Sequence, residues 1–171
     1  RGEWQVSDWP EYISSSISYA DATHSDKAKT LGVTNDAPIQ LRPNALRIAE
    51  LCEQVFALIG KCHLNSMYRS LTVNVLVGGS GSKPGEKVSA HCDFRAADLR
   101  PLEMPIQDAF EKLFQAQKTK QLNYQKMILE TDGNAHWVHI QVEPKGVIYT
   151  PQTMLANRVN GKMVYTPYGG M

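Results

Sequence analysis

The longest helical pattern in this chain begins at Pro43 and ends at Gly60. Proline is favoured in the first turn of a helix and glycine just past its end, so both boundaries are marked. Between them, apolar residues recur at helical spacing and form one stripe: Ala45, Ile48, Ala49, Cys52, Val55, Phe56 and Ile59. A helix with such a stripe buries it against other elements. We therefore interpret the stripe as core packing, with no cofactor implied.

A second amphipathic helix is predicted to begin at Pro105. Its apolar residues share one face: Ile106, Ala109, Phe110, Leu113 and Phe114. Shorter helical pieces are predicted after Ser18, Ser25 and Ser70, because a serine before a helical segment accepts a hydrogen bond from its free N–H groups. The chain thus supplies at least two helices with an apolar face to cover.

Short apolar runs predict the strands that those helices cover, at 62–69, 96–99, 127–129 and 137–140. The turn residues at 131–134 join the last two strands into a hairpin. A further hairpin is predicted near the C terminus, with Asn160 and Gly161 at its turn. Together these elements predict an α+β domain with helices packed on a small, mainly antiparallel sheet.

The length of 171 residues fits one domain. We expect residues 1–16, which carry Trp4 and Trp9, to be an arm that packs against a single domain at 17–171. The net charge is +1 without a basic stripe, which disfavours nucleic acid as a partner. No apolar run approaches the roughly 18 residues of a membrane span, and we expect a monomer. No signal peptide is visible, and the start at Arg1 is expected of a mature or trimmed chain.

Two histidines and an aspartate are the residues most suggestive of chemistry. His91 and Asp98 are seven residues apart, and His139 follows about forty residues later. Imidazole and carboxylate form a usual ligand set for catalytic zinc, which takes three protein ligands and leaves a position for water. The spacing alone is weak support for such a site, because these residue types are common.

Several short motifs around these residues follow one another along the chain. They are I-S-Y-A-D-A-T-H-S at 17–25 with L-G-V at 31–33, S-M-Y-R-S at 66–70, N-V-L-V-G-G-S at 74–80, S-A-H-C-D-F-R-A-A-D at 89–98 and W-V-H-I at 137–140. In this order they resemble the motifs of the zinc D-Ala-D-Ala carboxypeptidase-like peptidases of the M15 family, especially the branch of phage lysins and bacterial murein peptidases. The resemblance covers about residues 17–141 and implies a hedgehog/D-Ala-D-Ala peptidase-like fold.

By this resemblance, Zn²⁺ would be held by His91, Asp98 and His139. Arg69 matches the family arginine that binds the carbonyl oxygen or the carboxylate of the substrate, a role that suits a planar cation. A salt bridge is the alternative for Arg69. Ser89 would hydrogen-bond substrate, although it could equally cap the turn into His91.

The general base has two candidates, and His136 is favoured over Glu130. The family often carries an acid or a histidine three residues before the last ligand, which is the position of His136. Strand side chains alternate between faces, so His136 reaches the site only if it lies in the turn before the strand begins. A hairpin turn near Gly133 would instead bring Glu130 close to His139, as a base or as a partner of a ligand.

Two departures from the family pattern stand near the site. Phe94 occupies the position of a family glycine, where unusual backbone angles or close approach would be tolerated. The loop at 80–89 is longer than usual for the family. Either change could reshape the substrate cleft.

The expected function is zinc-dependent hydrolysis of the peptide stem of bacterial peptidoglycan, as a D-Ala-D-Ala carboxypeptidase or a stem endopeptidase. The partner would be the stem peptide, and the protein would be phage-encoded or bacterial and act at the cell wall. Phe94 motivates an alternative, a non-catalytic virion or cell-wall-binding module on the same scaffold. A third hypothesis is a cytosolic α+β protein with structural histidines.

Overall fold

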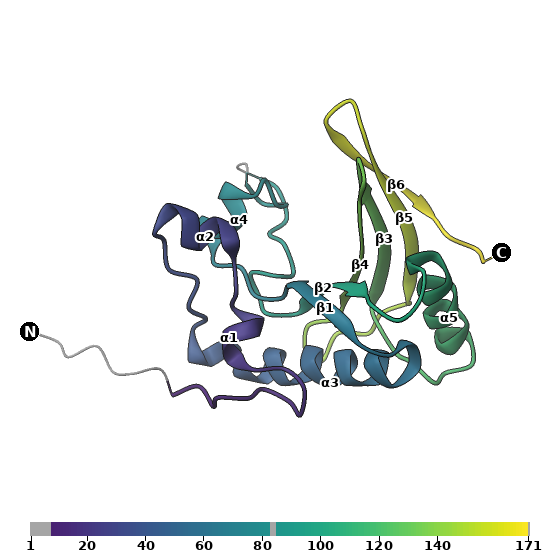
Figure 1. Ribbon diagram of the computed structural model, residues 1–171, viewed down its shortest axis with the longest axis horizontal. Helices are drawn as coiled ribbons and strands as arrows, with labels where there is room; N and C mark the ends of the chain where they lie inside the picture. The colour runs from purple at the N-terminus through teal and green to yellow at the C-terminus, as the bar shows by residue number, and fades with distance from the viewer. Residues whose placement is uncertain (1–7, 83–84, 171) are drawn as a thin grey trace, which may run out of the picture.

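The computed structural model describes residues 8–82 and 85–170, and a six-stranded sheet lies at its centre (Figure 1). In chain order the strands are β1 (Cys62–Ser66), β2 (Ala96–Pro101), β3 (Lys126–Asp132), β4 (Ala135–Gln141), β5 (Gln152–Val159) and β6 (Lys162–Pro167). They lie side by side in the order β1-β2-β4-β3-β5-β6. Neighbours pair antiparallel except β3 and β5, which are parallel. The sheet is therefore mixed, which is compatible with the predicted α+β fold.

Two long helices, α3 (Arg42–Ile59) and α5 (Ile106–Lys118), pack against one another and against β2, and α5 also contacts β4 (Figure 1). The predicted stripes form their buried faces. The short helices α1 (Tyr19–Ala22), α2 (Asp26–Leu31) and α4 (Leu71–Leu76) are on the side of the molecule away from α5, where α2 contacts α4. A 3-10 turn at Ile39–Leu41 leads into α3. Among the described residues, no helix is both long and apolar enough to cross a membrane.

Serine caps begin all three short helices, as predicted. The hydroxyl oxygens of Ser18, Ser25 and Ser70 accept hydrogen bonds from backbone N–H groups of the first turn that follows. Each cap satisfies a donor that has no partner within the helix. Such short helices have little stability of their own, so capping and tertiary contacts hold them.

The segment before α1 is tied to the domain. The Trp9 indole N–H donates to the carbonyl of Ala37 at 2.8 Å, and its ring stacks on Tyr19. The Glu53 carboxylate on α3 accepts hydrogen bonds from the hydroxyl of Ser14 at 2.6 Å and the backbone N–H of Ser16 at 2.7 Å. Trp4 lies outside the described residues.

The observed strands differ from the predicted ones mainly at their ends. The first strand was predicted to run to residue 69 but ends at Ser66, where a bulge interrupts the pairing with β2. The hairpin of β3 and β4 has a tighter turn than expected, formed by Gly133 and Asn134 alone. Both strands are therefore longer than predicted, which decides where His136 lies.

The two faces of the sheet have different surroundings. Val138 and Ile140 of β4 are fully buried in the hydrophobic core with α3 and α5. Trp137 and His139 alternate with them and lie on the opposite face. We call this opposite face the site face, because it carries every residue of the candidate centre that comes from a strand.

Candidate metal centre

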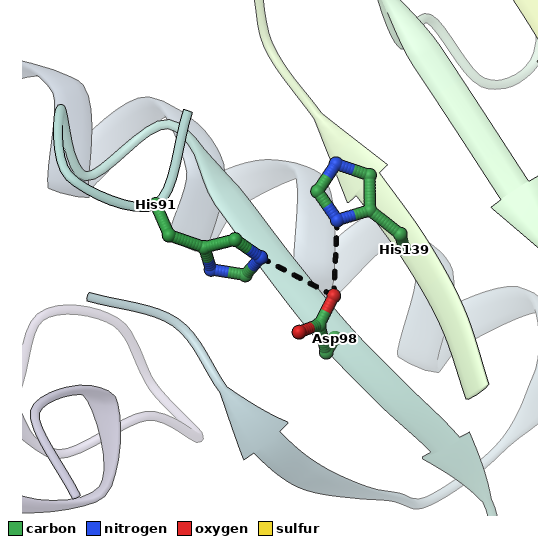
Figure 2. A group of neighbouring side chains, drawn as sticks. All are labelled: His91, Asp98 and His139. Carbon is green, nitrogen blue, oxygen red and sulfur yellow. Dashed lines mark hydrogen bonds and ion pairs between the residues drawn. The ribbon is translucent and has the colours of Figure 1, made fainter. Parts of the chain in front are cut away.

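His91, Asp98 and His139 come together in the fold, and all three are buried (Figure 2). Asp98 on β2 pairs directly with His139 on β4, so their side chains share the site face. His91 lies in the turn before β2 and points back toward Asp98. Asp98 Oδ1 is 3.3 Å from His91 Nε2 and 3.0 Å from His139 Nδ1. The three residues offer ligand atoms that lie within 4.8 Å of one another, so the group could hold a metal ion.

Phe94 shapes the turn that aims His91. Its φ of +56° lies in the left-handed region, and its backbone N–H donates to the carbonyl of His91 at 3.1 Å. The family pattern has glycine at this position, which would tolerate unusual backbone angles or close approach, and the backbone here has an unusual angle although the residue is phenylalanine. The ring is fully buried and packs against Tyr68 and Trp9, at centroid distances of 5.2 and 5.6 Å. The side chain therefore fills the core beside the turn.

Each imidazole has one nitrogen near Asp98 and one nitrogen that contacts another residue. The contact of the second nitrogen sets the tautomer of the neutral ring, and so decides whether the nitrogen near Asp98 has a lone pair. His91 Nδ1 is 2.7 Å from the carbonyl oxygen of Met67, which can only accept, so Nδ1 carries the proton. His91 Nε2 is buried and makes no hydrogen bond. His139 Nε2 is 3.0 Å from Gln141 Oε1, and the Gln141 amide N–H in turn donates to Gln125 Oε1. A neutral His139 therefore presents the lone pair of Nδ1.

This arrangement fits a cation. A carboxylate oxygen and the lone pairs of two imidazoles converge in a buried space, and they repel one another unless a positive charge lies between them. Burial lowers the pKa of His91, which favours the neutral form that metals require. Burial would raise the pKa of Asp98, but the two histidines hold it well below its usual range. For His139, burial acts to lower the pKa, yet the hydrogen bond and charge of Asp98 raise it. A proton shared by His139 Nδ1 and Asp98 Oδ1 would therefore compete with a metal ion for the same two ligand atoms.

Arg69 is engaged with the centre through Asp98. Its Nη2 donates to Asp98 Oδ2 at 2.7 Å, and its Nε donates to the hydroxyl of Ser66 at 2.9 Å. The salt bridge that was the alternative for Arg69 is therefore present, and it is partly buried, with 16% of the arginine side chain exposed. Asp98 has one oxygen for the histidines and one for Arg69, so its orientation is fixed.

The fold brings Glu130 to the centre and keeps His136 away. His136 was predicted to reach the site only if it lay in the turn before the strand. This condition is not met, because β4 begins at Ala135 and His136 is in regular strand. Its side chain lies on the face opposite His139, where Nδ1 is 3.1 Å from the hydroxyl of Thr131. Glu130 on β3 pairs with Trp137, and its Oε1 is 4.0 Å from His139 Nδ1. Burial raises the pKa of Glu130, as suits a group that takes up a proton.

Ser89 caps the turn that carries His91. Its hydroxyl accepts from the backbone N–H of His91 at 3.4 Å, and its own N–H donates to the carbonyl of Ser80 at 3.0 Å. The cap that was one of the two expected roles is thus present. It ties the loop at 80–89 to the turn that carries His91.

Two residues near the centre escaped prediction from the sequence. Gln141 follows His139 by two positions and so shares its face, a signal that strand alternation provides once His139 is taken as a ligand. Tyr165 on β6 is aligned with Glu130 through Ala156 of β5, in the register of the two strand pairs. Burial and the charge of Glu130 raise the pKa of Tyr165. No local pattern in the sequence reveals this non-local pairing.

Comparison with known proteins gives one match to a family. A search among curated proteins finds no match. A sequence model described as Peptidase M15 matches residues 15–141, more than half of the chain. The matched segment contains His91, Asp98 and His139 together with Arg69 and Glu130, and it ends where β4 ends. The chain therefore belongs to the Peptidase M15 family.

Proposed function

We propose that the protein is a zinc-dependent peptidase that hydrolyses the peptide stem of bacterial peptidoglycan. The observation that carries this proposal is the convergence of His91 Nε2, Asp98 Oδ1 and His139 Nδ1, with Glu130 beside them. Two imidazoles and one carboxylate are a ligand set of catalytic zinc sites, which keep a position open for water. Membership of the peptidase family supports the reaction class.

In the proposed mechanism, His91, Asp98 and His139 would hold the zinc ion. A zinc ion bound there would polarise the scissile carbonyl and lower the pKa of the attacking water towards about 7. Met67 and Gln141 orient the two imidazoles through their distal nitrogens, and such partners raise the basicity of the ligand. Arg69 holds the remaining oxygen of Asp98 and so keeps this ligand from rotating.

We propose Glu130 as the general base, in place of His136. Its carboxylate accepts the proton of the attacking water at Oε1 and delivers it to the leaving amine. The raised pKa of Glu130 brings it nearer to neutral pH, where a general base works best. Ser89 and the remaining N–H groups of Arg69 are proposed to bind substrate, the guanidinium being suited to a carbonyl or carboxylate oxygen.

The substrate class follows from the resemblance to murein peptidases noted in the sequence. It includes D-Ala-D-Ala carboxypeptidases and stem endopeptidases, and the place of action would be the cell wall, for a phage-encoded or a bacterial protein. The protein would act as a monomer. The alternative of a non-catalytic wall-binding module was motivated by Phe94, and this residue now has a structural explanation in the core.

The test is a digest of purified muropeptides by the full chain, read by mass spectrometry. The protein loaded with zinc should release D-Ala or a shortened stem, and a chelator should stop the reaction until zinc is restored. Protein that binds zinc but leaves all muropeptides intact would overturn the proposed activity. Sedimentation of such protein with cell-wall sacculi would favour the binding module.

A further inference from the structure

A hollow of about 440 Å³ lies near the end of β2 and the start of β4, two residues along each strand from the metal centre. Its lining comes from both sides of the sheet. Arg100 and Trp137 share the face of Asp98 and His139, whereas His136 lies on the opposite face. The other lining residues are Asn65 on β1, Asn134 and Ala135 at the turn, and Ile106 at the start of α5. We call this space the Arg100 hollow. Glu130, Arg69, Ser89 and the three proposed metal ligands are not among its lining residues, so the mechanism above leaves it without a role.

The strand register fixes the distance between the hollow and the centre. Arg100 follows Asp98 by two residues on β2, and Trp137 precedes His139 by two residues on β4. Residues two apart on a strand point to the same face and are about 7 Å apart. An extended peptide spans the same distance with two residues. A substrate whose scissile carbonyl lies at the centre can therefore place a group two residues away beside Arg100 and Trp137, the lining residues that share the site face.

The chemistry of the hollow favours an anion. Within the described residues, the arginines that form ion pairs with acidic side chains are Arg69, Arg95 and Arg158. The guanidinium of Arg100 has no acidic partner among these residues and can pair with an anionic ligand. The described residues that line the hollow include no aspartate or glutamate. Asn65 Oδ1 accepts a hydrogen bond from His63 Nδ1 at 2.9 Å, and the amide N–H groups of Asn65 are further donors. The ring of Trp137, which is partly buried, adds an apolar wall.

We propose that the Arg100 hollow binds a carboxylate of the peptide substrate, two residues from the bond that is cut. This proposal rests on the proposed function and narrows its substrate class to acidic peptides. A planar guanidinium can bind a carboxylate through two parallel hydrogen bonds. The apolar ring of Trp137 offers a surface for the part of the peptide that carries the carboxylate.

The experiment compares two peptides that differ only in a carboxylate or a carboxamide two residues from the scissile bond. Binding to the chelator-treated full chain is measured by fluorescence anisotropy, because under the proposed function that protein does not cleave. Cleavage by the zinc-loaded chain is measured in parallel as kcat and KM. We expect the acidic peptide to bind about fivefold more tightly and to have a correspondingly lower KM, since one partly exposed charge pair contributes about this much.

Arg100→Gln should remove the preference in both assays. Arg42→Gln is the matched control, because it deletes the same charge from an exposed position on α3 outside the hollow. Equal binding of the two peptides by the wild-type chain would overturn the proposal, and so would an equal loss in the Arg42 variant. Inorganic phosphate tests for a general anion site: if it displaces the acidic peptide at equal concentration, the proposal is also wrong.

The two assays separate this proposal from the proposed function. Absence of cleavage together with an Arg100-dependent preference in binding would contradict the peptidase activity and keep the carboxylate site. Cleavage of both peptides with equal kcat/KM would support the peptidase and contradict the site.

Discussion

Replacing Phe94 by glycine sets two opposing effects against each other. The residue has a φ of +56°, which costs a non-glycine residue about 1–2 kcal/mol. Its ring is fully buried between Tyr68 and Trp9. Deleting a buried phenylalanine ring costs about 3–5 kcal/mol, and glycine adds about 0.5–1 kcal/mol of backbone entropy. Loss of the ring therefore outweighs the relief of backbone strain, and Phe94→Gly should lower the free energy of unfolding by about 3 kcal/mol.

Urea unfolding of the zinc-free protein, followed by circular dichroism, measures this change. Phe94→Ala is the matched control, because it removes the ring but keeps a side chain in the left-handed region. It should be less stable than the glycine variant by about 1 kcal/mol. A glycine variant as stable as the wild-type chain would refute the role of the ring in the core. An alanine variant more stable than the glycine variant would refute the strain.

Three further predictions concern the base, the second partner of a ligand and pH. Glu130→Gln should lower kcat by about 10²–10⁴ with zinc retained, whereas His136→Gln should keep kcat within about twofold of the wild-type value; the reverse pattern would contradict the assignment. Gln141→Leu removes the acceptor at His139 Nε2 and should weaken zinc binding about 10–100-fold in competition with a chromophoric chelator. Unchanged affinity would show that Gln141 does not support the ligand. Burial alone would raise the pKa of Glu53, but its hydrogen bonds to serines lower it below the usual 4.5. Its stabilising contribution is therefore present above about pH 4.5 and lost as pH falls through the folded-state pKa, so the stability of Glu53→Gln should fall less steeply than that of the wild-type chain in acid. Parallel curves from denaturant titrations between about pH 5 and 3 would contradict this.

Local signals in the sequence were sufficient where structure depends on neighbours along the chain. Proline and glycine predicted α3 closely, with its observed end at Ile59 followed by Gly60, and serine caps predicted the start of α4 after Ser70. At Phe94 the motif indicated a position that tolerates unusual backbone angles or close approach, and the left-handed backbone found there agrees with the first of these. These features depend on few residues at a time.

Features that depend on pairing between strands could not be predicted in the same way. The two-residue turn at Gly133 and Asn134 moved His136 into the strand and away from His139. A shift of one residue in register reverses the face of every side chain, so the base could not be assigned before the turn was known. The parallel pair of β3 and β5 joins segments separated by β4, and no local pattern indicates it.

Zinc content is the most direct test of the central claim that His91, Asp98 and His139 form a metal centre. The full chain is dialysed against zinc, then against metal-free buffer, and analysed by plasma mass spectrometry next to Asp98→Ala. The structure predicts one tightly bound zinc ion per wild-type chain and none in the variant, because Asp98 Oδ1 is the atom shared by both histidines. A wild-type chain that retains no zinc, or a variant that retains as much as the wild type, would contradict the account.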